Sequence, residues 1–138
     1  MGSDERAGLC LGNVLIMATR CYIGIKIAVD EFKSIYCHND GYPMHVGKML
    51  KEHYSDRSVA ESLISLGDMK RLAESIEASV FYRRDRGETE YVDTEIRTMD
   101  ELLDGAYAYI FDNEWLCAGR SGEWLSIDAA IALQVAGG

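Results

Sequence analysis

The chain has 138 residues, of which 48% are hydrophobic and 27% are charged. This composition predicts one globular domain that buries enough apolar surface to fold without a metal or a disulfide. The formal net charge of −9 disfavours general nucleic-acid binding, which needs an excess of Lys and Arg, and disfavours attachment to an anionic membrane. We therefore expect a cytoplasmic protein whose acidity either keeps it soluble or steers it to a basic partner surface.

The first part of the chain contains its one sustained apolar run, residues 9–18. About ten residues are too few to span a bilayer. Met17, followed by Ala18-Thr19-Arg20, is typical of a start of translation. We interpret residues 1–16 as an N-terminal extension and residues 17–138 as a single α+β domain.

Residues 21–29 are rich in Ile, Val and Tyr and predict a strand, and residues 32–36 predict a second one. Asp30-Glu31 is a suitable turn between them, so a β-hairpin is expected. Pro43 is typical of the first turn of a helix, where its missing N–H does no harm.

A second helix is expected to begin at Asp56 or Ser58, with Ser58 and Glu61 forming a capping box, and to end at Gly67. Residues 68–76 predict a further short helix. The remaining elements are a strand at 78–82, a charged turn at 83–90, strands at 90–96, 106–111, 114–118 and 123–126, a helix opened by a Thr98–Glu101 capping box, and a C-terminal helix capped by Asp128. This order predicts the α+β class, with helices packed on an antiparallel sheet.

The stretch 36–43, Tyr-Cys-His-Asn-Asp-Gly-Tyr-Pro, is the densest group of polar and aromatic side chains. We expect Tyr36, His38, Asp40 and Tyr42 to contact a ligand or partner. A Cys37–His38 nucleophile and base is disfavoured, because neighbouring residues of a strand point to opposite faces.

A metal site is an alternative, with His38 and Asp40 joined by His45 or His53. Because His45 and His53 are eight residues apart, about two helical turns separate them, so both reaching one ion is disfavoured. A purely structural role is favoured: Asp40 and Gly41 form a turn, and Asp40 caps the helix. We assign no catalytic residue, no metal ligand and no cofactor.

Arg83, Arg84 and Arg86 form the one basic cluster of the acidic chain. Guanidinium groups grip phosphates and carboxylates in a fork, so Arg84 and Arg86 are candidate anion contacts. Next to the tyrosines of 36–43 they would suit a nucleotide-like ligand. The structural alternative is a solvated turn in which the arginines pair with neighbouring acidic residues, namely Asp85, Glu88 and Glu90.

From Met17 onward the chain resembles a family of small proteins encoded by bacteriophages and other mobile elements. The resemblance rests on Met-Ala-Thr-Arg at 17–20, Ile-Tyr-Cys-His-Asn-Asp-Gly-Tyr-Pro at 35–43, Val-Gly at 46–47, His-Tyr at 53–54, Leu-Ile-Ser-Leu-Gly-Asp at 63–68 and Arg-Asp-Arg-Gly-Glu at 84–88. Members often carry Trp where this chain has Asn39, so a role for an indole there is absent. The resemblance implies a phage context without a known activity.

These observations favour a non-enzymatic phage accessory protein in the host cytoplasm that binds a host protein or a small nucleotide-like signalling molecule and counteracts host defence. The alternative is a small hydrolase or nucleotide-processing enzyme that uses His38 and Asp40 as acid and base, with or without a metal ion. Homo-oligomer formation stays open.

Overall fold

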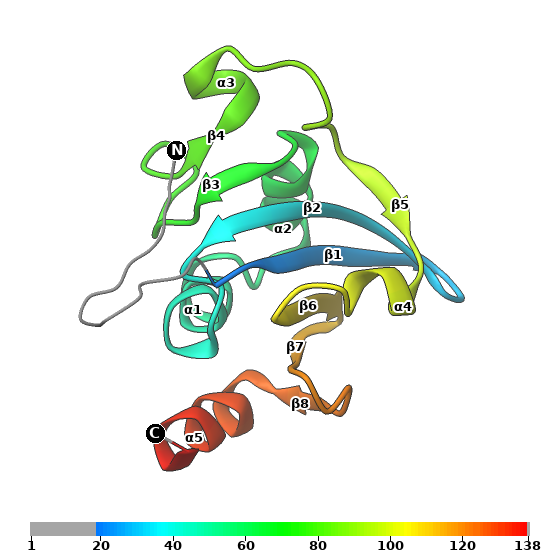
Figure 1. The fold of residues 1–138 in the computed structure, drawn as a ribbon, viewed down its shortest axis with the longest axis vertical. Helices are drawn as coiled ribbons and strands as arrows, with labels where there is room; N and C mark the ends of the chain where they lie inside the picture. Colours follow the sequence, from blue (N-terminus) through cyan, green and yellow to red (C-terminus); the bar gives the residue numbers. More distant parts are fainter. Residues whose placement is uncertain (1–18, 138) are drawn as a thin grey trace, which may run out of the picture.

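A computed structural model describes residues 19–137, and the predicted extension at 1–16 lies outside that range. Eight strands form one mixed sheet in the order β4-β3-β2-β1-β6-β7-β8, with β5 also paired to β2 (Figure 1). Their bounds are β1 Cys21–Ala28, β2 Glu31–Asn39, β3 Met69–Arg71, β4 Val80–Phe81, β5 Glu95–Arg97, β6 Tyr107–Asp112, β7 Glu114–Ala118 and β8 Trp124–Ser126.

The helical segments are η1 Pro43–Gly47, α1 Lys48–His53, α2 Arg57–Ser65, α3 Tyr82–Arg86, α4 Met99–Leu102 and α5 Ile127–Gly137. In Figure 1, α3 lies beyond β3 and β4 at one end of the sheet, and α5 lies beside β8 at the other. Within residues 19–137, no helix has the length and apolar character needed to cross a membrane.

Mixed helices and strands agree with the expected α+β class, but the antiparallel sheet is wrong. Strands β1 and β6 pair in parallel, and so do β2 and β3. Parallel neighbours need a long crossover connection. Here η1, α1 and α2 connect β2 to β3. The expected helix at 68–76 is wrong, because Met69–Arg71 form β3. Without that strand, the crossover from β2 to β3 could not be predicted.

The hairpin of β1 and β2 is confirmed, although its turn lies one residue earlier than expected. Val29 and Asp30 form the turn, and Asp30 has a positive φ of 56°. A register shift between Lys26 and Ala28 then places Tyr22 opposite Tyr36. Because a slip of one residue exchanges the faces of a strand, this irregularity decides which side chains meet.

Several helix boundaries follow the expected chemistry. Gly67 ends the α2 region with φ +85°, a backbone conformation that favours glycine. The Thr98–Glu101 capping box opens α4. Of the two expected caps of α2, Asp56 is confirmed, because its carboxylate accepts the Ser58 N–H. The expected Ser58–Glu61 capping box is wrong.

Two further expectations are wrong. The predicted charged turn at 83–90 contains the helix α3, Tyr82–Arg86. At the start of α5, the Ser126 hydroxyl accepts the Ala129 N–H, in the role that was expected of Asp128.

The two faces of the sheet are packed differently. On the first, which we call the helix face, the apolar side chains of β1, β2, β6 and β7 pack against η1, α1, α2 and α5 in the main core. The second, which we call the α4 face, holds a smaller core of Phe32, Leu102, Ala108 and Ile110. Because α4 has only four residues, it covers only a small part of this face.

Candidate functional site

Alternation along β2 separates the residues of the predicted site. Ile35 and Cys37 are fully buried on the helix face, whereas Tyr36 and His38 are half-buried on the α4 face. The expectation that Cys37 and His38 lie on opposite faces is therefore confirmed.

Cys37 belongs to a group of buried free thiols with Cys21 and Cys117. Burial raises the pKa of the Cys21 thiol well above its usual range, and it raises the pKa of Cys117 to about 12. Since the thiolate is the reactive form, Cys21 and Cys117 are packing residues rather than nucleophiles.

Tyr36 and His38 are joined directly. The Tyr36 hydroxyl lies 2.8 Å from His38 Nδ1. Burial raises the pKa of Tyr36 to about 12. Burial, with Arg20 and Lys70 nearby, lowers the pKa of His38. At pH 7 the phenol is therefore protonated and the imidazole neutral, so the hydroxyl can donate to Nδ1 while Nε2 carries the ring proton.

The register of the sheet explains why Arg20 and Lys70 flank His38. Cys21 is opposite Cys37 on one side of β2, and Met69 is opposite Cys37 on the other. When both pairings are continued by one residue, Arg20 and Lys70 lie on either side of His38, in agreement with the effect of their charges on its pKa. Two cations thus stand on either side of one imidazole in a strongly acidic protein.

Tyr22 extends the aromatic group across the hairpin. Its ring centroid is 5.7 Å from that of Tyr36, and the Tyr36 and His38 rings are 5.9 Å apart. The Arg97 guanidinium lies 4.5 Å from the Tyr22 ring centroid. We call Tyr22, Tyr36 and His38 the aromatic cluster.

Asp68 supports the cluster at the edge of β2. Pairing with β5 ends at Ser34 and pairing with β3 begins at Cys37. In the gap between them, the Asp68 carboxylate accepts the Tyr36 N–H at 2.8 Å. Asp68 is only 6% exposed, and burial raises its carboxyl pKa.

The three arginines of the basic cluster all lie on α3, but their side chains have different partners. Arg86 lies over the Tyr82 ring and pairs with Glu88, and Tyr82 is close enough to affect the pKa of Tyr36. Arg84 instead pairs with Asp85 and lies over the Phe81 ring.

Arg83 pairs with Asp93. The expected pairing with Asp85 and Glu88 is therefore confirmed, whereas the structure pairs none of the three arginines with Glu90.

Asp40 and Tyr42 have other neighbours. The Asp40 carboxylate is 3.2 Å from Arg71 Nε. Asp40 has a positive φ of 58°, but no turn is formed at Asp40 and Gly41, and the Gly41 N–H donates to the Thr19 carbonyl oxygen. The expected helix cap is wrong, because Tyr42 occupies the N-cap position of η1. The Tyr42 ring lies 6.4 Å from that of His45.

The histidines of the alternative metal site are engaged elsewhere. His45 Nε2 lies 2.8 Å from the Leu72 carbonyl oxygen, and His53 is next to Glu52. Among residues 19–137, no group of three His, Cys, Asp or Glu side chains is arranged to hold a metal ion.

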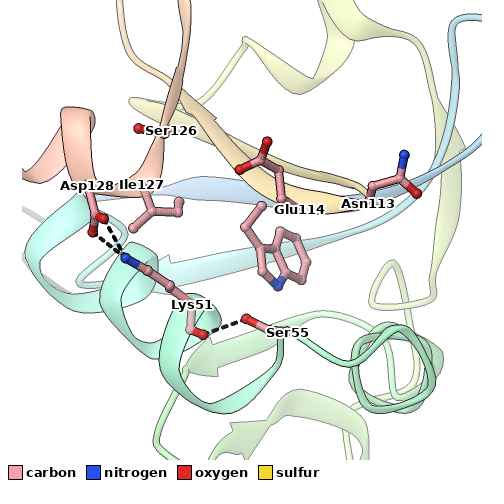
Figure 2. A pocket seen from close by; sticks show the side chains of 8 residues that line it. Lys51, Ser55, Asn113, Glu114, Ser126, Ile127 and Asp128 are labelled. Atoms are coloured by element: carbon pink, nitrogen blue, oxygen red, sulfur yellow. Dashed lines mark hydrogen bonds and ion pairs between the residues drawn. The ribbon is translucent and has the colours of Figure 1, made fainter.

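Two of the hollows formed by residues 19–137 lie away from the cluster. The first, of about 210 Å³, is lined by Lys51, Ser55, Asp128 and neighbouring residues. Figure 2 shows the Lys51 side chain pointing toward Asp128. Lys51 Nζ lies 2.5 and 2.6 Å from the two Asp128 carboxylate oxygens. Its volume is below the range of about 300–1,000 Å³ that is usual for ligand sites.

The second hollow, of about 750 Å³, is a groove between α5 and the neighbouring strands, lined in part by Tyr107, Leu125 and Leu133. It holds none of the predicted contact residues.

Four residues around the cluster were missed from the sequence: Arg20, Tyr22, Lys70 and Asp68. Arg20 and Tyr22 were missed because the turn expected at Asp30-Glu31 gives a different pairing of the two strands from the observed one. No signal pointed to Lys70, because the strand that carries it was expected to be a helix.

Comparisons with family models, with curated proteins and with solved structures found no significant match. The site must therefore be interpreted from its geometry.

Proposed function

We propose that this chain is a phage-encoded accessory protein that binds a host protein or small signalling molecule in the host cytoplasm and thereby counteracts host defence. The observation that carries the binding role is the half-buried aromatic cluster flanked by Arg20 and Lys70. The phage context comes from the sequence resemblance.

Aromatic rings that are held in place but not covered are well suited to recognition. Tyr and His bring large contact areas with few rotatable bonds, so little conformational entropy is lost on binding. Tyr36 is held at its hydroxyl by His38 and at its backbone N–H by Asp68. This preorganisation lowers the free-energy cost of association.

The contacts of His38 and Asp40 favour binding over acid–base catalysis. To act as acid and base, both side chains must be free to reach the reacting atoms of one substrate. Here His38 meets the Tyr36 hydroxyl, whereas the Asp40 carboxylate pairs with Arg71.

The test is affinity capture with the full tagged chain from bacterial lysate, followed by mass spectrometry of proteins and small molecules. Tyr36→Leu removes the central ring. Arg57→Gln is the matched control, because Arg57 is exposed on α2 and pairs with Glu61. We expect one species to co-purify with the wild type and the control but not with Tyr36→Leu. Equal recovery with all three proteins would contradict the proposed surface.

His38→Ala separates the two classes of function. For a binding protein, this substitution weakens capture and the biological effect together, because both depend on the surface that the imidazole provides. A variant that captures its partner fully yet loses all biological effect would support the enzyme alternative instead.

A further inference from the structure

We propose that the ligand of the aromatic cluster is a small nucleotide, with its base stacked on the Tyr36 ring and its phosphate between Arg20 and Lys70. This inference rests on the proposed function and adds the chemical class of the ligand. It follows from the order of the side chains across three neighbouring strands.

The rings supply the site for a base. Tyr36 lies between Tyr22 and His38, with centroid distances of 5.7 and 5.9 Å and interplanar angles of 59° and 56°. The tilt leaves the three rings without parallel stacking among themselves. A flat heteroaromatic group stacks on such a surface whichever base it is, since every base has a π face.

The cations supply the site for a phosphate. Neighbouring strands are about 4.8 Å apart, so the backbones at Arg20 and Lys70 are separated by roughly 10 Å across His38. Two long cationic side chains at that separation can meet on one phosphate group above the imidazole. Burial is the largest cause of the lowered pKa of His38, and the charges of Arg20 and Lys70 lower it further.

Charge restricts the size of the anion. The whole chain carries a net charge of −9, so the positive field around His38 is local. A nucleic-acid strand would place further phosphates over acidic surface, and its affinity depends on many cationic contacts. A ligand with one or a few phosphates needs only the cations of this face, which are Arg20 and Lys70 beside His38 and Arg97 at Tyr22.

The side-chain order also distinguishes the two ends of the ligand. Tyr22 and Tyr36 are opposite each other in β1 and β2, and Arg20, His38 and Lys70 form the next row toward the start of β1. Because Arg97 already lies over the Tyr22 ring, we expect the base over Tyr36 and the phosphate over His38.

The test is isothermal titration of the full chain with AMP, adenosine and ribose 5-phosphate. We expect AMP to bind more tightly than either fragment. Tyr36→Leu should raise the Kd for AMP roughly tenfold, as expected for loss of one base–aromatic stack. Tyr36→Phe keeps the ring and should stay within about threefold of the wild type.

Lys70→Gln should weaken AMP and ribose 5-phosphate but leave adenosine binding unchanged. Arg57→Gln, on the helix face, should change none of the three affinities. Far-ultraviolet circular dichroism checks that each variant is folded. If Tyr36→Leu unfolds, the proposal is still tested by Lys70→Gln, which should weaken AMP binding, and by Tyr36→Phe, which should not.

Two results would overturn the nucleotide proposal. One is absence of AMP binding at millimolar concentration. The other is binding of a single-stranded oligoadenylate far more tightly than AMP with a steep salt dependence. If AMP fails while Tyr36→Leu still abolishes capture of a protein, binding at this surface stands and only the ligand class is wrong.

Discussion

The two faces of β2 give neighbouring residues opposite roles. Ile35 and Cys37 are completely buried against the helices, whereas Tyr36 and His38 are half-buried on the other side with cations beside them. A cysteine and a histidine adjacent in the sequence thus belong to different environments. Two reactive side chains that are close in a strand sequence can therefore form one site only if they lie on the same face of the sheet.

The largest expected difference is in the free energy of unfolding, between a variant of the helix face and a variant of the α4 face. Ile35→Ala removes a fully buried side chain from the main core and should lower the free energy of unfolding by about 2–5 kcal/mol. Tyr36→Leu keeps an apolar side chain on the half-buried face and should cost far less. Urea unfolding of both variants measures this. Equal losses would show that Tyr36 is a core residue and contradict the comparison.

Asp68 tests how the second face is held in place. Asp68→Ala leaves the Tyr36 N–H without its acceptor and should lower the free energy of unfolding by about 1–3 kcal/mol. Asp68→Asn keeps an acceptor oxygen and removes a charge whose burial raises the carboxyl pKa.

The Asn variant should therefore be at least as stable as the wild type at neutral pH, because the ionised carboxylate loses hydration in the folded state. Thermal unfolding at pH 7 measures both variants. If Asn and Ala are equally destabilising, the negative charge itself, through Arg97, is what matters.

The smallest effect concerns the titration of His38. Its folded-state pKa is lowered by burial and by Arg20 and Lys70, so the unfolded chain binds a proton more readily. The stability of the fold should decrease as the pH falls below about 6.5, the ordinary pKa of histidine, and should not depend on His38 above it.

His38→Gln should remove this part of the profile. Denaturant unfolding of the wild type and the variant between about pH 5 and 8 gives the difference. A wild type that becomes more stable relative to His38→Gln on acidification would contradict the inferred direction of the pKa shift.

Local patterns predicted the elements whose boundaries depend on nearby residues. The β1–β2 hairpin, the stop at Gly67 and the Thr98 capping box are of this kind. Strand β3 was missed because three residues, Met69–Arg71, offer too short a pattern, and their extended form depends on pairing with β2 and β4. The parallel pairing of β2 with β3 was missed with it. The parallel pairing of β1 with β6 was missed although both strands were expected, because local patterns do not fix the order of strands in a sheet.

The candidate site divides in the same way. Tyr36 and His38 were identified from the sequence and lie together, since residues two apart in a strand share a face. Their association with Tyr22, Lys70 and Asp68 was not predictable, because it depends on the register shift in β1 and on the gap between β5 and β3.

The central claim is that recognition occurs on the face that carries Tyr22, Tyr36 and His38. The most direct measurement is the mapping of amide chemical-shift changes in the ¹⁵N-labelled chain during titration with AMP. We expect the largest changes at Tyr22, Tyr36, His38 and Lys70, with little change in α2. Changes concentrated in the groove beside α5, or no change at any residue from 19 to 137, would contradict the account.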